Sequence, residues 1–146
     1  MEATFIARDH QMHQMTSIPD KFRDLLDQKK AFANLATIMA DRSPQVTPVW
    51  FDYTDGVIRV NTAKGRVKAR TLKPGASVAL AIMDPDNPYR YLQIRGRVRK
   101  ATEAGADAHI DSLAKKYLGK DTYPFRRHGE VRVMYEIEPI SVSGQD

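Results

Sequence analysis

Short runs in which apolar and polar residues alternate, separated by turn sequences, recur along most of this 146-residue chain. Such alternation predicts β-strands, because successive side chains of a strand point to opposite faces of a sheet. Between residues 45–53 and 57–61, Asp55-Gly56 supplies the two-residue turn that is typical of a β-hairpin. Pro48 cannot donate a backbone hydrogen bond, so we expect the first of these strands to lie at an edge or to carry a bulge. Further strands are predicted over residues 31–39, 77–83, 89–100 and 129–137.

Three segments have helical spacing instead, over residues 19–30, 64–72 and 102–118. We expect Ser17 to cap the first helix and Gly119 to end the last one. His109, beside the apolar face of the last helix, is expected to be partly exposed. The segments do not alternate as β-α-β-α, so a doubly wound parallel sheet is not expected. The residues predict a small, mainly β barrel of six mostly antiparallel strands with helices at its rim.

The composition excludes several kinds of site and of protein. Cysteine is absent, which excludes disulfides, zinc–thiolate sites, iron–sulfur clusters and cysteine nucleophiles. Hydrophobic residues make up 42% and charged residues 28% of the chain, the balance of a globular protein. The longest apolar runs, such as residues 77–83, are far shorter than the roughly 20 residues that cross a bilayer. No secretory signal is evident, so we expect a cytoplasmic protein without a membrane partner.

The chain is long enough for one ordinary domain, which we place at residues 17–146. Residues 1–16 are polar and show no clear periodicity, so we expect them to form a flexible arm. His10 and His13 in this arm are spaced as metal ligands would be on a helix. No third ligand is in view, and we expect no metal site.

Positive charge is concentrated in one part of the chain. Between Val57 and Lys100 there are eleven basic and two acidic residues, a surplus of nine charges, although the net charge of the whole chain is only +5. A segment with such a surplus is typical of proteins that bind an anion, whether nucleic acid, membrane lipid or a phosphorylated small molecule.

The centre of this segment, Asn61 to Arg70, follows a predicted strand and begins a predicted helix. Free backbone N–H groups at such a junction attract anions, and the glycine in the turn would let a ligand approach closely. In one continuous helix, Arg66 and Arg70 share a face, while Lys64 and Lys68 point away from it. All four can serve one anion only if Lys64 lies in the turn before the helix. The residues alone are equally compatible with a solvated basic face and with a phosphate site.

Several short motifs follow one another in an order that resembles a known family. They are Leu35-Ala-Thr37, Pro44-Gln-Val-Thr-Pro-Val-Trp50, Asn61-Thr62, Lys64-Gly-Arg-Val-Lys-Ala-Arg70, Asn87-Pro-Tyr-Arg-Tyr91 and Arg95-Gly-Arg-Val98. This order is similar to that of the pyridoxamine-phosphate-oxidase-like split-barrel flavoproteins, and most similar to their branch of probable deazaflavin (coenzyme F420) dependent reductases. The resemblance extends over residues 18–140. After the basic turn, family members commonly continue with Asn-Leu-Arg-Arg-Asp-Pro-Arg, where this chain has Thr71-Leu-Lys-Pro-Gly-Ala-Ser77.

The resemblance implies a six-stranded antiparallel split β-barrel of the FMN-binding type with peripheral helices. It also implies a homodimer with two cofactor sites at the subunit interface. One strand would present its backbone to an isoalloxazine-type ring, and the basic turn would hold the phosphate and acidic tail. The implied cofactor-binding residues are Thr47, Pro48, Val49, Trp50, Asn61, Thr62, Lys64, Arg66, Lys68 and Arg70. We expect Arg90 and Tyr91 to border the substrate pocket, and no residue is nominated as catalytic.

The implied function is hydride transfer from reduced deazaflavin to a conjugated small organic substrate, with the cofactor carrying the chemistry. Coenzyme F420 has a phosphodiester and an acidic glutamyl tail, which a long basic segment favours over the monophosphate of FMN. An FMN-dependent oxidoreductase and a non-enzymatic cofactor carrier are the alternatives. A more remote alternative is a basic barrel that binds single-stranded nucleic acid, since basic and aromatic residues interleave over residues 89–95.

Overall fold

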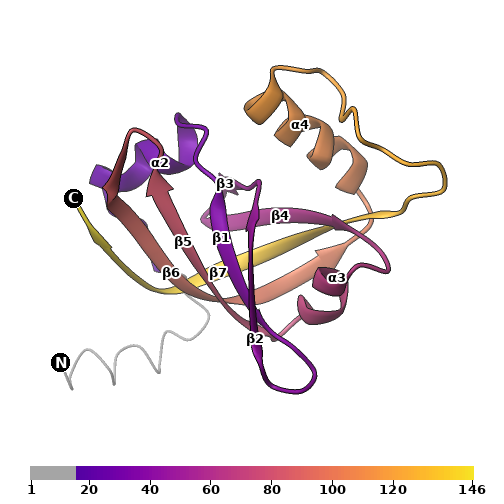
Figure 1. The fold of residues 1–146 in the computed structure, drawn as a ribbon, viewed down its shortest axis with the longest axis horizontal. Coiled ribbons are helices and arrows are strands. Elements are labelled where there is room, and N and C mark those ends of the chain that lie inside the picture. Colours follow the sequence, from indigo (N-terminus) through magenta and orange to yellow (C-terminus); the bar gives the residue numbers. More distant parts are fainter. Residues whose placement is uncertain (1–15) are drawn as a thin grey trace.

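Seven antiparallel strands form one sheet in the computed structural model, which describes residues 16–146 (Figure 1). In chain order the strands are β1 (Ala33–Ile38), β2 (Pro44–Val49), β3 (Asp52–Thr54), β4 (Val57–Ala63), β5 (Ser77–Asp84), β6 (Asn87–Thr102) and β7 (Arg132–Gln145). Across the sheet they lie in the order β2-β1-β5-β6-β7-β4-β3. The helical segments are η1 (Asp20–Phe22), α2 (Arg23–Asp27), α3 (Val67–Thr71) and α4 (Ala106–Leu118). The predicted mainly β, antiparallel architecture is confirmed, while the predicted arm, with His10 and His13, lies outside the described residues except for Thr16.

The two edge strands, β2 and β3, are neighbours in the sequence but lie at opposite ends of the strand order. Only Trp50 and Phe51 separate them, and the three peptide steps between Val49 and Asp52 span at most about 11 Å. The sheet must therefore curl until its two edges meet, as Figure 1 shows by the crossing of β1 and β2 in front of β7. This closure produces the split β-barrel that the resemblance implies.

Two details of the predicted strand layout and of the first helix are wrong. Residues 45–53 do not form one strand. They are divided between β2, which pairs with β1, and β3, which pairs with β4, so the sheet has seven strands rather than six. Ser17 does not cap a helix, because the first helical turn starts only at Asp20, and Pro19 at its N-cap position makes no side-chain cap hydrogen bond. Pro48 does lie on an edge strand as predicted, since β2 pairs only with β1.

Side chains of α4 satisfy the backbone where the two edges meet. The hydroxyl of Tyr117 accepts a hydrogen bond from Phe51 N at 3.3 Å and donates one to Ala31 O at 2.7 Å. The ammonium of Lys116 donates to Phe51 O at 2.8 Å and to Leu26 O at 3.1 Å. Burial lowers the pKa of Lys116 and raises that of Tyr117. Trp50 and Phe51 form the connector between β2 and β3. Phe51 can therefore be fully inaccessible without leaving its peptide groups unpaired.

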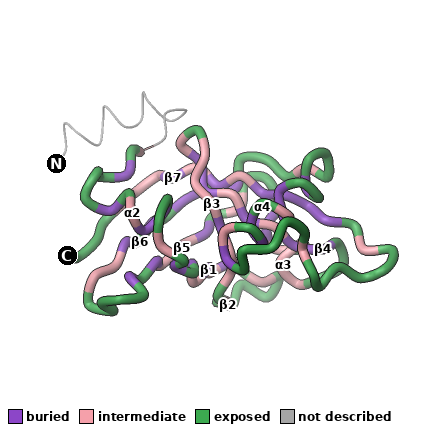
Figure 2. The backbone as a smooth tube through the Cα atoms, turned by 90° about the horizontal axis from the view of Figure 1, so that it is seen from above, coloured by how far each residue is buried: buried purple, intermediate pink, exposed green. Residues whose placement is uncertain are grey.

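The interior of the barrel is apolar. Buried positions concentrate on β1, on β4 to β7 and on α2 and α4, whereas most turns are exposed (Figure 2). Outside this core, Arg90 ties α2 to the β5–β6 hairpin through Asp24 at 2.6 Å and Asp84 at 2.8 Å. A hydrogen bond from Lys29, supported by Asp86 N–H and Arg90, holds the pKa of Asp84 well below its usual value. None of the helices within residues 16–146 combines the length and the hydrophobicity that a membrane span requires.

Substitution of Gly96 by alanine should destabilise the barrel. Gly96 lies at an irregularity of the β6–β7 ladder, where an added Cβ would stand 2.6 Å from Glu138 O and 2.8 Å from a methyl group of Ile137. Relieving such overpacking costs about 1–3 kcal/mol, so urea unfolding of Gly96→Ala should show a lower midpoint at an unchanged slope. Ser143→Ala, at an exposed position of β7, serves as the control and should change little. Equal midpoints for Gly96→Ala and the native chain would contradict this packing argument.

Candidate functional site

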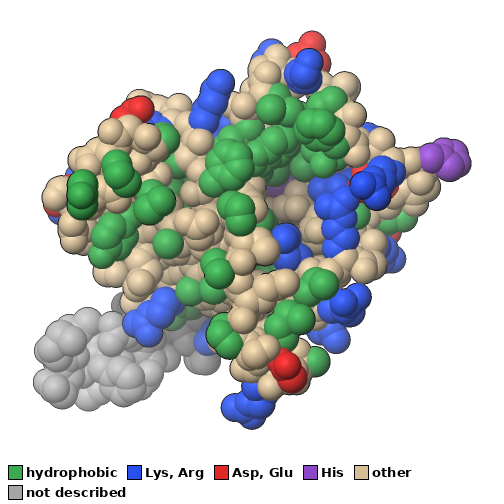
Figure 3. Space-filling view, viewed as in Figure 1, with side chains coloured by type: hydrophobic (Ala, Val, Ile, Leu, Met, Phe, Trp, Pro, Cys, Tyr) green, Lys and Arg blue, Asp and Glu red, His purple; other side chains and the backbone are tan. Residues whose placement is uncertain are grey.

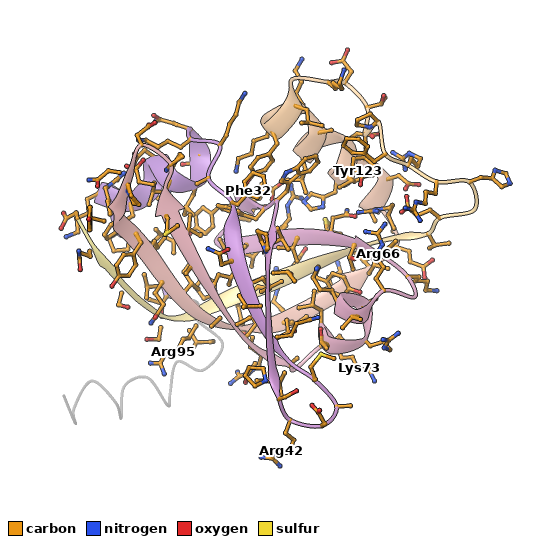
Figure 4. All side chains as sticks on the ribbon, in the orientation of Figure 1. Phe32, Arg42, Arg66, Lys73, Arg95 and Tyr123 are labelled. Atoms are coloured by element: carbon orange, nitrogen blue, oxygen red, sulfur yellow. The ribbon has the colours of Figure 1, made fainter. Side chains whose placement is uncertain are left out.

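A pocket of about 260 Å³ opens where the two sheet edges meet, between the connector, β4, α3 and α4. It is lined by Phe32, Pro48, Val49, Trp50, Asn61, Thr62, Arg66, Lys68, Ile110, Leu113, Tyr123, Phe125 and Arg132. Hydrophobic side chains and basic side chains border the same hollow from different sides in Figure 3. Phe32, Tyr123 and Arg66 lie around it in Figure 4, whereas Arg42, Lys73 and Arg95 lie away from it. The pocket therefore has an apolar part and a cationic part.

Eight of the ten residues expected to bind a cofactor lie at this pocket. Pro48, Val49, Trp50, Asn61, Thr62, Arg66 and Lys68 line it, and Thr47 adjoins it by accepting a hydrogen bond from Lys68 Nζ at 2.9 Å. They come from three separate segments, which the closure of the sheet brings together.

Lys64 and Arg70 do not line the pocket. The ammonium of Lys64 lies 2.6 Å from Glu103, and Arg70 donates a hydrogen bond to Gly65 O at 3.4 Å; both side chains are exposed. Lys64 does lie in the turn before the helix, because α3 starts only at Val67. The basic turn is thus divided, with Arg66 and Lys68 facing the pocket and the other two cations facing elsewhere.

Arg90 and Tyr91, expected at the substrate pocket, do not line this pocket either. The guanidinium of Arg90 donates hydrogen bonds to Asp24, Asp84 and the backbone of Lys21. Tyr91 pairs with β5 and with the end of β7. Within the single chain, these residues serve the junction between α2 and the β5–β6 hairpin.

Positive charge exceeds negative charge at the pocket. Glu130 lies 3.0 Å from Arg132 and 3.5 Å from Arg66, so one carboxylate faces two guanidinium groups. Within residues 16–146, Lys68 has no carboxylate partner, and burial together with the charge of Arg66 lowers the pKa of Lys68. An anion in the pocket would relieve this imbalance, because it would favour the charged form of the lysine.

The apolar part of the pocket is built from aromatic rings. Trp50 stacks on Tyr117 with ring centroids 5.2 Å apart, and Tyr123 meets Trp50 edge-on at 6.1 Å. Phe125 extends this row, and Phe32 borders it with 48% of its surface exposed. Exposed aromatic side chains beside a cationic pocket suit a planar ring that carries an anionic group.

Several of these lining residues were not predicted from the sequence. Tyr123 and Phe125 stand in a polar loop, and two aromatic residues in such a loop were the signal that could have identified them. Arg132 gave no such signal, since strand alternation at the start of β7 is equally consistent with a solvated arginine. Only the structure shows that Arg132 is 4% exposed and lines the pocket.

His109 is buried, not partly exposed as predicted, because α4 packs against β7 and β4. Asn61 Nδ2 lies 3.0 Å from His109 Nδ1, and His109 Nε2 lies 3.2 Å from Asp52 Oδ2. Arg59 also holds the Asp52 carboxylate, at 2.7 and 2.8 Å. Burial alone would raise the pKa of Asp52, but His109 and Arg59 outweigh it and lower the pKa to about 2.

The low pKa of Asp52 predicts an acid-sensitive contribution to stability. Because the folded-state pKa lies below the ordinary value of 3.8, this contribution is present above that pH and is lost as the pH falls towards 2. Asp52→Asn should lower the unfolding free energy at pH 7 by about 2 kcal/mol and should flatten its decline between pH 4 and pH 2. Asp55→Asn, at an exposed turn position where asparagine accepts the positive φ of 53°, is the matched control. Parallel stability–pH curves for both variants and the native chain would contradict the role of Asp52.

Comparison with known proteins places this geometry in a family. The sequence profile described as Pyridoxamine 5'-phosphate oxidase matches residues 18–146. Among solved structures, an F420 reductase is 31% identical with a TM-score of 0.73, over 86% of this chain and 98% of that chain. No curated protein sequence matches the chain.

Two more distant structures share the fold alone. A conserved hypothetical protein from Mycobacterium tuberculosis is 20% identical, with a TM-score of 0.66 over 90% of this chain and 86% of that chain. A FAD and heme binding protein from Mycobacterium smegmatis is 17% identical, with a TM-score of 0.63 over 90% of this chain and 72% of that chain. Since the profile and the F420 reductase both match over most of its length, the chain belongs to the pyridoxamine 5'-phosphate oxidase-like family of split-barrel proteins.

Proposed function

We propose that this protein is an oxidoreductase that uses the deazaflavin coenzyme F420 to reduce a conjugated small organic molecule. The observation that carries the proposal is the two-part pocket, in which a row of aromatic rings adjoins a cationic part that contains an uncompensated lysine. The 31% identity with an F420 reductase supports the choice of this cofactor. FMN is the alternative, because its monophosphate needs fewer cations than the longer acidic tail of F420.

The residues of the pocket fit such a cofactor. Lys68, Arg66 and Arg132 would hold its anionic part, where the excess of positive charge needs an anion. Trp50 and Tyr123 would lie beside its ring and exclude water from it. When bound, the cofactor would supply the hydride, and the chain would contribute binding, orientation and electrostatics.

Loss of the Lys68 charge should weaken cofactor binding selectively. A hydrogen bond to a charged group contributes about 1.5–3 kcal/mol to binding. Lys68→Met should therefore bind F420 about 10- to 100-fold more weakly. Fluorescence titration of the apoprotein measures this affinity. Lys64→Met is the matched control, because Lys64 belongs to the same basic turn but pairs with Glu103 outside the pocket. The affinity of Lys64→Met for F420 should stay within about twofold of the native value, because an exposed ion pair contributes little.

The same titration separates the candidate functions. If FMN binds more tightly than F420, FMN is the cofactor instead of F420. If neither binds at micromolar concentration, the proposal is overturned. Oxidation of reduced F420 is then followed with a panel of conjugated organic compounds. Binding without oxidation above the uncatalysed rate would identify a cofactor carrier instead of an enzyme.

We further propose that the protein forms a homodimer. The sheet carries a second, larger groove of about 770 Å³, whose lining includes Ile38, Val78, Ile140 and Val142. Ile38 is 52% exposed there, and apolar surface of this kind is commonly covered by a second copy. Light scattering on the purified protein should give twice the chain mass of 16.5 kDa, and a mass equal to one chain would exclude the dimer.

A further inference from the structure

Arg132 is a buried cation with hydrogen-bonding capacity to spare. It is only 4% exposed, and its guanidinium donates from Nε to Asn61 Oδ1 at 2.8 Å and from Nη1 to Glu130 Oε1 at 3.0 Å. Its Cζ lies 5.2 Å from the ring centroid of Tyr123. Within residues 16–146, no group accepts a hydrogen bond from Nη2. Nη2 is not among the fully buried unpaired atoms, so it reaches the pocket surface as a free donor, and this arginine of the pocket lining is suited to an anionic ligand.

The orientation of Arg132 is set by Asn61, whose side chain has no N–H donor left for an anionic ligand. Its Oδ1 accepts from Arg132, and its Nδ2 lies 2.9 Å from Ala106 O and 3.0 Å from His109 Nδ1. A flipped amide would direct N–H groups at the guanidinium, so only one orientation satisfies all three partners. Asn61 therefore has no donor for an anionic group and acts on such a group through Arg132.

His109 in turn fixes Asn61. Because both N–H groups of Asn61 donate, Nδ1 of His109 is an acceptor and the ring carries its proton on Nε2. That nitrogen lies 3.2 Å from Asp52 Oδ2. Asp52, His109, Asn61 and Arg132 thus form a chain of contacts from β3 through α4 and β4 to β7.

We propose that His109 is a positioning residue, which holds Arg132 through Asn61 so that the guanidinium can bind the phosphate group of the ligand. The role rests on the proposed function, since the ligand is the phosphorylated cofactor. Through this role, His109 affects the binding of the anionic part of that ligand and not of its ring. The ring would lie against the aromatic residues of the pocket, of which Tyr123 lies beneath Arg132.

The experiment compares two ligands that differ only in their anionic part: F420 and the corresponding deazariboflavin, which lacks the phosphate and the glutamyl tail. His109→Leu removes the acceptor for Asn61, and Arg132→Lys keeps the charge but removes the Nε donor to Asn61. Each variant should bind F420 at least about tenfold more weakly, while deazariboflavin affinity changes less than about twofold. A general structural defect would weaken both ligands alike, and that result would overturn the proposal.

The double variant tests whether His109 acts through Arg132. If it does, His109→Leu should cause no further loss of F420 affinity in the Arg132→Lys background. Independent, multiplying losses would overturn the positioning role.

A conservative variant serves as the rescue. His109→Asn places an amide oxygen at the position of Nδ1, so it keeps the acceptor for Asn61 and loses only the contact with Asp52. Its affinity for F420 should stay within about threefold of the native value, and thermal unfolding of each variant checks that it is folded. A His109→Asn variant that binds F420 as weakly as His109→Leu would contradict the proposal.

A native chain that does not bind F420 would overturn the proposed function and this role together. If the native chain binds F420 and His109→Leu leaves that binding unchanged, this role alone is overturned.

Discussion

The two-residue connection between β2 and β3 is the constraint on which the rest of the structure depends. These strands form the two opposite edges of the sheet, yet Trp50 and Phe51 are the only residues between them. The sheet can satisfy this connection only by curling into a split barrel. Closure would bury the peptide groups of Phe51, and Tyr117 and Lys116 of α4 supply the hydrogen bonds that make this burial tolerable.

The pocket is a consequence of the same closure. Trp50 leaves the sheet beside α4, while the end of β4 brings Asn61 and Thr62 to the same place. The short helix α3 then adds Lys68, and β7 adds Arg132 next to β4. Aromatic and cationic groups thus meet at the seam of the barrel, and the buried contacts of α4 that stabilise the seam also support the pocket.

Much of the fold could be predicted because its signals are local. Alternation identified the strands, and Asp55-Gly56 identified its hairpin, in which both residues have positive φ. The failure over residues 45–53 has a physical reason: alternation reports which side chains share a face, but not which ladder a strand joins. His109 was misjudged for a similar reason, because the polar partners that allow its burial lie 48 and 57 positions away in the sequence.

The sequence by itself determined the antiparallel class, the edge position of Pro48 and the basic turn that follows β4, since each depends on residues close together in the chain. The tertiary structure decided which cations of that turn face the pocket. It directed Lys68 inward and paired Lys64 with Glu103, and it added Arg132 from a distant strand. The physical reason is that charge and periodicity are properties of a segment, whereas a binding site requires burial and direction, which only the packing of separate segments against one another can set.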